Sequence, residues 1–275
     1  MKAKIISFIN MKGGVGKTTL CLGVGEYLAH YDNKKILYID LDPQFNTTQT
    51  LMNEYNLEEV YLTNYYQSKN ICKIFSTPNT IAEKPEIPKA EEVIVELDNS
   101  IHIVPGTINL IFEDSRESGK IRRVKKFIAD NELREKYDYI FIDCPPTISL
   151  YTDAALIASD YYLVPNRVDR YSILGIKLLK QVIDRLKSDF DLDIKPLGIV
   201  YTMITNSTLK TTTLKGKFEE DDMVKEIGLF NNSTSYVNDL LVGYQGNIAS
   251  KYKKSREDII ALSMEFKERI ENDEK

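Results

Sequence analysis

Residues 4–19 of the chain read KIISFINMKGGVGKTT. Residues 4–9 form a short, mostly apolar run with β-branched and aromatic side chains, which predicts a strand. From Thr18 onward, Leu20, Val24 and Leu28 recur at spacings of three or four residues, which predicts a helix. The glycine-rich stretch between them predicts a phosphate-binding loop, because glycines let backbone N–H groups converge on an anion at the start of a helix.

The ending Gly-Lys-Thr identifies this loop as a nucleotide-binding P-loop rather than a plain turn. We expect Lys17 to contact the β- and γ-phosphates, Thr18 to bind Mg²⁺ and Thr19 to hydrogen-bond the α-phosphate. The other residues predicted to hold phosphates form the turn itself, and they are Gly13, Gly14, Val15 and Gly16.

Strand-like segments alternate with helical ones along the chain. The further predicted strands lie at 35–40, 101–105, 137–143, 160–165 and 195–201, and the clearest helices at 120–134 and 171–188. This alternation predicts an α/β fold, a doubly wound and mostly parallel sheet with helices on both faces. We expect one domain over residues 1–275, with an irregular insertion at 53–100 and a C-terminal helix at about 258–270.

Acidic residues stand at the ends of two predicted strands. Asp40 ends the strand at 35–40, Asp42 stands two residues later, and Asp143 ends the strand at 137–143. Ligands of parallel sheets bind beyond the carboxyl ends of the strands, so we expect these carboxylates and the P-loop to meet at one edge. For Asp42, the alternative is that it caps the turn before Pro43.

The composition excludes several classes of protein. Of 275 residues, 43% are hydrophobic and 28% charged, which is typical of a globular chain. The net charge of −5 excludes a wholly basic nucleic-acid coat, so any DNA contact must come from a local patch. Cys21, Cys72 and Cys144 form no CxxC pair, which favours a reducing cytosol, and no apolar run approaches the ~20 residues of a membrane span. We therefore predict a cytoplasmic protein.

Residues 12–19 resemble the deviant P-loop of the ParA/MinD group of ATPases, in which a signature lysine stands before the glycines, as Lys12 does here. Residues 38–44 (YIDLDPQ) resemble the second motif of ParA/Soj partition ATPases, and residues 140–147 (IFIDCPPT) resemble their Walker B strand. Weaker matches follow in the family's order, at Val164, Pro165, Asp169, Tyr171, Gly175, Tyr201, Thr202 and Met203. The resemblance covers about residues 2–270 and is poorest over 53–100.

The resemblance implies an ATPase that closes into a homodimer on binding ATP and Mg²⁺ and turns over slowly by itself. Lys12 would reach across the two-fold interface to the partner's nucleotide, and Asp42 would orient the attacking water. Together with Lys17, these residues form the predicted catalytic set. Asp40 would lie near the water shell of Mg²⁺, and Asp143 would hold the ion through water, with Thr18 as the third metal-site residue.

In relatives the base lies against segments that match residues 164–166 and 201–203. Pro165 and Met203 are therefore candidate cofactor-binding residues, whereas the residues that contact adenine stay open. We expect Cys21 and Cys144 to fill small buried spaces rather than to hold an iron–sulfur cluster.

Partition ATPases bind DNA without sequence preference when ATP-bound, and a ParB-type centromere-binding protein stimulates their hydrolysis. Such binding needs lysines and arginines that face phosphates. The candidate DNA-contacting residues here are Lys210, Lys215, Lys217, Lys251, Lys253, Lys254 and Arg256. A further basic stretch lies at 120–126, and for every cluster the alternative is a solvated helix or loop face.

We therefore predict a nucleoid-associated ATPase for plasmid or chromosome partition. The alternative is a ParA-like ATPase that positions a protein cargo, because it would share all these motifs. A MinD-like membrane switch ranks below both, since a MinD-like anchor is a basic amphipathic helix, whereas this chain's last residues include Glu268, Glu271, Asp273 and Glu274. We expect no stable membrane association.

Overall fold

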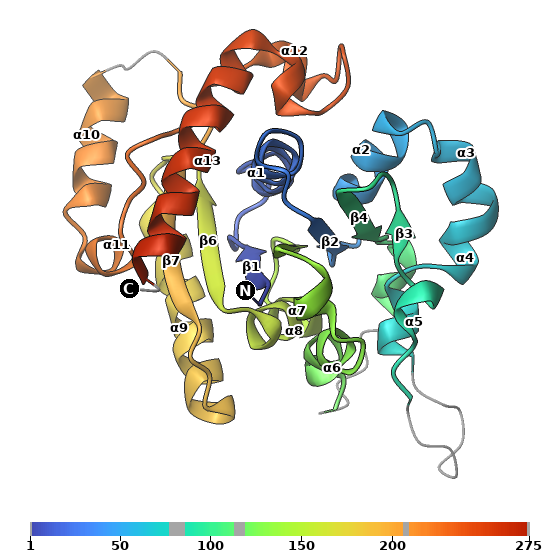
Figure 1. Ribbon diagram of the computed structural model, residues 1–275. Coiled ribbons are helices and arrows are strands. Elements are labelled where there is room, and N and C mark those ends of the chain that lie inside the picture. The colour runs from blue at the N-terminus through green and yellow to red at the C-terminus, as the bar shows by residue number, and fades with distance from the viewer. Residues whose placement is uncertain (1, 77–85, 113–118, 206–208, 274–275) are drawn as a thin grey trace.

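A seven-stranded sheet forms the centre of the computed structural model (Figure 1). The structure describes residues 2–76, 86–112, 119–205 and 209–273. The strand order is β3-β4-β2-β5-β1-β6-β7, and among these strands only β3 runs antiparallel to its neighbour. The strands are β1 (Lys4–Phe8), β2 (Ile36–Asp40), β3 (Val95–Glu96), β4 (Ile101–Val104), β5 (Tyr139–Asp143), β6 (Tyr161–Asn166) and β7 (Lys195–Tyr201). The predicted α/β fold with a mostly parallel sheet is confirmed.

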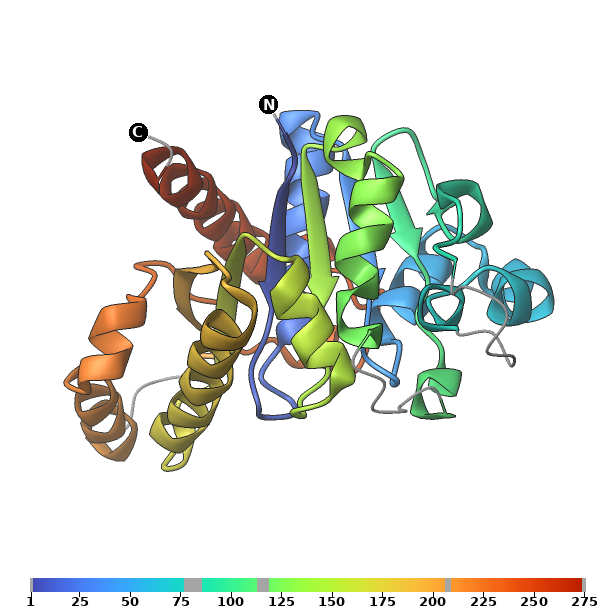
Figure 2. The same ribbon diagram turned by 90° about the horizontal axis from the view of Figure 1, so that it is seen from below.

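Helices cover both faces of this sheet (Figures 1 and 2). The α-helices are α1 (Lys17–Asp32), α2 (Asn46–Glu54), α3 (Glu58–Val60), α4 (Tyr66–Ser68), α5 (Cys72–Phe75), α6 (Arg123–Asp130), α7 (Leu133–Lys136), α8 (Leu150–Ala158), α9 (Ser172–Phe190), α10 (Leu209–Glu219), α11 (Asp222–Ile227), α12 (Asn238–Leu241) and α13 (Lys253–Asp273). Single turns of π- or 3₁₀-helix are η1 (Tyr61–Tyr65), η2 (Ala90–Glu92), η3 (Ile108–Phe112), η4 (Lys120–Arg122) and η5 (Ala249–Lys251). Apolar residues of α1, α2 and α13 pack on one face of the sheet, and those of α5, α6, α8 and α9 pack on the other.

The strand register brings the predicted strand ends together. Phe8, the last residue of β1, lies opposite Asp143 of β5, and Asp143 lies opposite Asp40 of β2. The P-loop leaves β1 at this edge, so it and both acidic strand ends share one edge of the sheet. The expected convergence is confirmed, and it follows from the parallel pairing alone.

Two local features differ from the prediction. The edge strand β3 was not predicted, because two residues are too few to show an alternating pattern. The helix predicted at 120–134 is divided between η4, α6 and α7, and Glu132, which adopts the left-handed conformation (φ 52°), separates α6 from α7. The segment predicted as an irregular insertion, 53–100, consists mainly of short helical turns where it is described, and its residues 77–85 lie outside the described ranges.

The C-terminal helix α13 is longer than the predicted 258–270. Its apolar residues Ile259, Leu262, Phe266 and Ile270 are buried at helical spacing. The first turn is Lys-Lys-Ser-Arg, which offers no apolar residue to mark the start of the helix. Periodicity alone therefore placed the helix start too late.

Glu265 of α13 holds the loop that follows β7 and α11. It is 7% exposed, and its carboxylate accepts hydrogen bonds from the backbone N–H groups of Asn231 (2.8 Å) and Asn232 (2.9 Å). The Arg269 side chain donates to Oε1 of the same carboxylate. Burial disfavours the charged form of Glu265, but these hydrogen bonds outweigh that effect and hold its pKa below the ordinary value.

Replacing Glu265 by glutamine should lower the free energy of unfolding at pH 7 by about 2 to 4 kcal/mol, because an amide cannot accept all these bonds. The folded-state pKa lies below the unfolded one, so the stabilisation is present above the unfolded pKa and is lost as the pH falls through the folded pKa. Urea denaturation should show a gap between variant and wild type that narrows towards pH 4. The exposed Glu268→Gln change on the same helix is the control and should be nearly neutral; an equal gap at both pH values would refute the ionic account.

Candidate nucleotide-binding site

The P-loop backbone has the shape that phosphate binding requires. Gly14 (φ 68°) and Gly16 (φ 81°) adopt the left-handed conformation, which glycine reaches without steric cost. Between them Val15 is buried and anchors the loop. Helix α1 begins at Lys17, and no side chain caps its N-terminus. The first backbone N–H groups of α1 are thus open to an anion.

Lys17 is 7% exposed, and its Nζ donates a hydrogen bond to the carbonyl oxygen of Lys12 at 3.3 Å. Burial lowers the pKa of its amine, and the nearby charges of Asp143 and Asp42 oppose that shift. A buried cation with a single long hydrogen bond gains from the arrival of a phosphate oxygen.

Asp143, at the end of β5, is 1% exposed and has a free oxygen. The hydroxyls of Thr18 and Thr47 donate to its Oδ2 at 2.6 and 2.7 Å. Its Oδ1 is buried and has no hydrogen-bond partner. Burial raises the pKa of Asp143 to about 6, so the ionised carboxylate is poorly stabilised by its protein neighbours.

These residues fit Mg²⁺. The ion prefers hard oxygen ligands, keeps several waters and is commonly bound through one carboxylate beside phosphates. The free Oδ1 of Asp143 and the Thr18 hydroxyl supply such oxygens beside the P-loop. Thr47 was not predicted from the sequence, although it stands five residues after Asp42 in the same strand-end segment.

Asp40 organises the segment that carries Asp42. Its Oδ2 accepts hydrogen bonds from the backbone N–H (2.9 Å) and hydroxyl (2.7 Å) of Thr48, and its Oδ1 accepts one from the N–H of Asp42 (3.2 Å). Burial and the neighbouring Asp143 raise the pKa of Asp40 well above its usual range. Both Asp40 oxygens thus bond to the chain itself, which makes Asp143 the better supported metal-site carboxylate.

Asp42 is 7% exposed and lies near enough to Lys17 for their charges to interact. Its Oδ1 accepts a hydrogen bond from the N–H of Gln44 at 2.9 Å. Asp42 therefore does cap the turn, as the alternative interpretation expected. Burial raises the pKa of Asp42, and the Gln44 bond and Lys17 partly offset this. Capping and a catalytic role are compatible, because one carboxylate oxygen makes the cap.

Lys12 lies at the outer side of the loop and pairs with a residue of its own chain. Its Nζ forms an ion pair with the Asp169 carboxylate, and its backbone N–H donates to Oδ1 of Asn10 at 3.0 Å. Hydrogen bonds from Lys12 and from the Tyr171 N–H outweigh partial burial and lower the pKa of Asp169. In this conformation the Lys12 amine points to Asp169 and not to the P-loop phosphate position.

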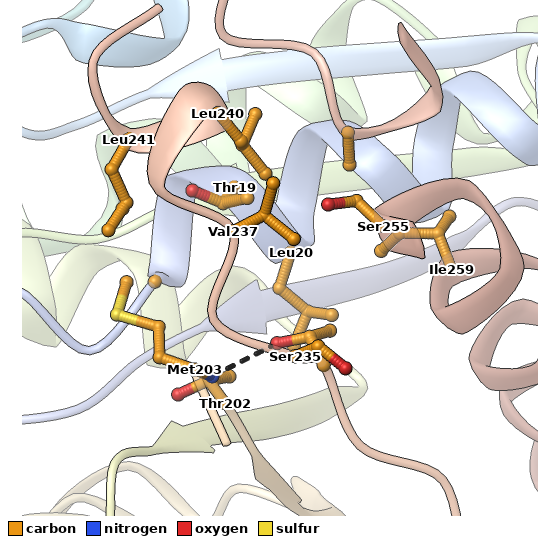
Figure 3. Close-up of a pocket in the computed structure, with 13 residues that line it drawn as sticks. Thr19, Leu20, Thr202, Met203, Ser235, Val237, Leu240, Leu241, Ser255 and Ile259 are labelled. Carbon is orange, nitrogen blue, oxygen red and sulfur yellow. Dashed lines mark hydrogen bonds between the residues drawn. The ribbon is translucent and has the colours of Figure 1, made fainter. Parts of the chain in front are cut away.

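Met203 follows β7 and lines a small cavity beside the P-loop, together with Gly16 and Thr19 (Figure 3). Its N–H donates to the Thr234 hydroxyl at 3.3 Å, the bond drawn in Figure 3. The preceding residue, Thr202, donates from its hydroxyl to the carbonyl of Val15 at 2.7 Å and so ties this segment to the loop. Pro165 does not line the cavity.

The structure separates the predicted DNA-contacting residues by how they are paired. Lys210, Lys217, Lys253 and Arg256 are exposed. Lys251 pairs with Glu54 (2.5 Å), Lys254 with Asp258 (3.1 Å) and Lys215 with Glu219 (3.7 Å). In the stretch 120–126, Lys120 and Arg123 are buried, whereas Arg122, Lys125 and Lys126 are exposed.

Cys21 and Cys144 are both buried, as packing residues would be, and none of the described His, Cys, Asp and Glu residues form a ready metal cluster. No helix among the described residues has the length and apolar character that crossing a bilayer requires.

Comparison with known proteins gives consistent matches. Residues 3–195 match the family described as an AAA domain. An uncharacterized protein of Methanocaldococcus jannaschii is 33% identical over 72% of this chain and 72% of its own. The sporulation initiation inhibitor protein Soj of Bacillus subtilis is 30% identical over 82% of this chain and 83% of its own.

Among solved structures, a plasmid partition protein of Borrelia burgdorferi bound to AMPPNP superposes with a TM-score of 0.74 at 22% identity. The superposition covers 99% of this chain and 100% of the other. At this identity the likeness supports the fold.

Proposed function

Because this chain belongs to the ParA/Soj family of P-loop ATPases, we propose that it is an ATP-driven, dimerising switch that partitions a plasmid or chromosome. The observation that supports this proposal most is that Lys17, at the start of α1, lies beside Asp42, which follows β2, and Asp143, which ends β5. A structural role could account for any one of these residues. It does not account for a buried lysine, two buried aspartates and an unbonded oxygen of Asp143 gathered around one phosphate-binding loop.

In the proposed reaction, ATP and water give ADP and phosphate. The α1 N-terminus and Lys17 hold the phosphate oxygens and neutralise charge that develops on the γ-phosphate. Bound Mg²⁺ would supply further charge neutralisation, and Thr18 and Asp143 are the residues placed to hold it. Asp42 orients the attacking water and accepts its proton. A switch needs slow basal turnover, so we expect a kcat below about 1 s⁻¹ without partners.

In the proposed dimer, Lys12 leaves Asp169 and contacts the nucleotide of the partner subunit. The ion pair is partly exposed, with side-chain exposures of 34% and 37%, so breaking it costs little compared with a contact to a triphosphate. ATP then favours closure of the dimer because the two facing triphosphates repel each other, and the positive charge of Lys12 from each subunit reduces that repulsion.

The closed dimer binds DNA without sequence preference through exposed basic residues on α10 and at the start of α13. Of the predicted set, Lys210, Lys217, Lys253 and Arg256 are exposed and form no ion pair with another described residue, whereas the exposed Lys215 and Lys254 do. A ParB-type partner stimulates hydrolysis and thereby releases the DNA. The protein is then cytoplasmic and associated with the nucleoid.

A gel shift tests this proposal directly. The Asp42→Ala variant should shift random-sequence duplex DNA with ATP–Mg²⁺ but not with ADP, and the affinity should fall steeply as salt rises. A Lys253→Glu change should weaken DNA affinity several-fold. Lys2→Glu, which makes the same change at an exposed lysine near the N-terminus, should leave the affinity unchanged.

Absence of a shift at any salt, from protein shown to dimerise with ATP, would contradict the partition proposal. That result would favour the alternative, the positioning of a protein cargo by the same ATPase cycle. ATP-dependent binding to anionic liposomes would instead support a membrane switch.

A further inference from the structure

The cavity beside the P-loop is lined by a hydroxyl that bonds to none of the described residues. Ser255, on the first turn of α13, is 4% exposed, and its Oγ is buried without a hydrogen-bond partner. In Figure 3 this Oγ points from α13 into the space between Val237 and Leu20. A buried hydroxyl without a partner costs about 1 to 3 kcal/mol, so a ligand group that reaches Ser255 through the cavity would recover part of that cost.

The cavity has a phosphate end and an apolar end. Gly16 and Thr19 of the P-loop line one side. The rest of its lining is mainly apolar and comes from four separate parts of the chain, with Leu20, Met203, Val237, Leu240, Leu241, Ala249 and Ile259 among its members. A nucleotide with its phosphates on the loop would extend past Thr19 towards these side chains. A flat, largely apolar ring fits such walls better than a ribose does.

The cavity is small, about 30 Å³, and a space of about 10 to 15 Å³ is enough for one water-sized group. It therefore admits a small polar substituent of a ring, such as an amino group, but not a whole purine ring. An amino group placed there would find the Ser255 oxygen as its acceptor.

We propose that Ser255 is a specificity-determining residue that accepts a hydrogen bond from the 6-amino group of a bound adenine. This inference rests on the proposed function as an adenine-nucleotide switch and adds the residue that distinguishes the base. Ser255 lies between Lys254 and Arg256 in the stretch first considered for DNA contact, but its side chain faces the interior.

Calorimetric titration with two diphosphates isolates this contact. ADP carries the 6-amino group, and purine riboside 5′-diphosphate has hydrogen in its place; neither is hydrolysed. Wild type should bind ADP about 10-fold more tightly than the analogue, and Ser255→Ala should lose about 10-fold towards ADP while keeping its affinity for the analogue within two-fold. The two changes are then coupled, as a direct contact requires.

Ser263 provides a matched control. It lies on the same helix, is fully buried and likewise has an unpartnered hydroxyl, but it does not line the cavity. Ser263→Ala should leave both affinities unchanged. Nucleotide-free Ser255→Ala should be as stable as wild type or slightly more stable, because the lost hydroxyl had no partner.

Equal weakening of both ligands by Ser255→Ala, or no weakening of either, would overturn the assignment. Coupling to the 2′-hydroxyl instead, measured with 2′-deoxy-ADP, would also overturn it and assign Ser255 to the ribose. These results differ from failure of the proposed function, in which wild type itself binds neither ADP nor ATP with Mg²⁺.

Discussion

The Lys17→Ala variant should lose nucleotide binding, with the Kd for ADP–Mg²⁺ raised at least about 100-fold. The lysine amine is buried beside the carboxylates of Asp143 and Asp42. Removing it takes away the cation that meets the phosphates and also leaves two acidic groups unopposed next to them. Both effects act against the same ligand charge, so the loss should exceed that of an ordinary hydrogen bond. Isothermal titration calorimetry measures it.

Lys12→Ala is the matched control, because it makes the same substitution in the same loop. The Lys12 side chain pairs with Asp169, and only its backbone carbonyl meets Lys17. We therefore expect its ADP affinity to stay within a few-fold of wild type, while ATP-dependent dimerisation, followed by light scattering, is lost. Near-normal ADP binding by Lys17→Ala would show that the phosphates bind elsewhere, whereas equal losses in both variants would show that the change deforms the loop.

The sequence predicted the parts of the site whose chemistry is local. A P-loop is one continuous segment, and Asp40, Asp42 and Asp143 stand directly at strand ends. Once the strands are parallel, the fold leaves these residues one place to meet, so a correct choice of strands sufficed.

What the sequence did not show depends on contacts between distant segments. Thr47 faces Asp143 across 96 positions, and Glu265 holds Asn232 across 33. Ser255 looked like one residue of a basic surface stretch, but in the structure α13 packs against α1 and η5 and this side chain is buried. Arg123 differs from the expectation in the same way: a charge run is usually solvated, but this guanidinium is buried and donates to the backbone carbonyls of Ile74 and Glu86.

The dual position of Asp42 decides how its catalytic role must be tested. Its Oδ1 caps the N–H of Gln44, so Asp42→Ala removes both a turn contact and a carboxylate. Asparagine keeps an oxygen for that cap but cannot accept a proton from water. Asp42→Asn therefore tests the loss of the proton acceptor alone. The difference between Asp42→Ala and Asp42→Asn then gives the contribution of the hydrogen bond to Gln44.

Asp42→Asn should lower the ATP hydrolysis rate by about 100- to 10,000-fold, the usual contribution of general-base catalysis, while ATP affinity stays within a few-fold. Burial raises the pKa of Asp42, and only the ionised form accepts a proton. The wild-type rate should thus fall as the pH drops through that raised pKa, and the residual rate of the Asn variant should lack this dependence. Phosphate release measured across pH, with partner protein and DNA present, gives both quantities. If Asp42→Asn hydrolysed ATP at the wild-type rate, Asp42 would have only the structural role of capping the turn at Gln44. The proton acceptor would then have to be another group that faces the P-loop.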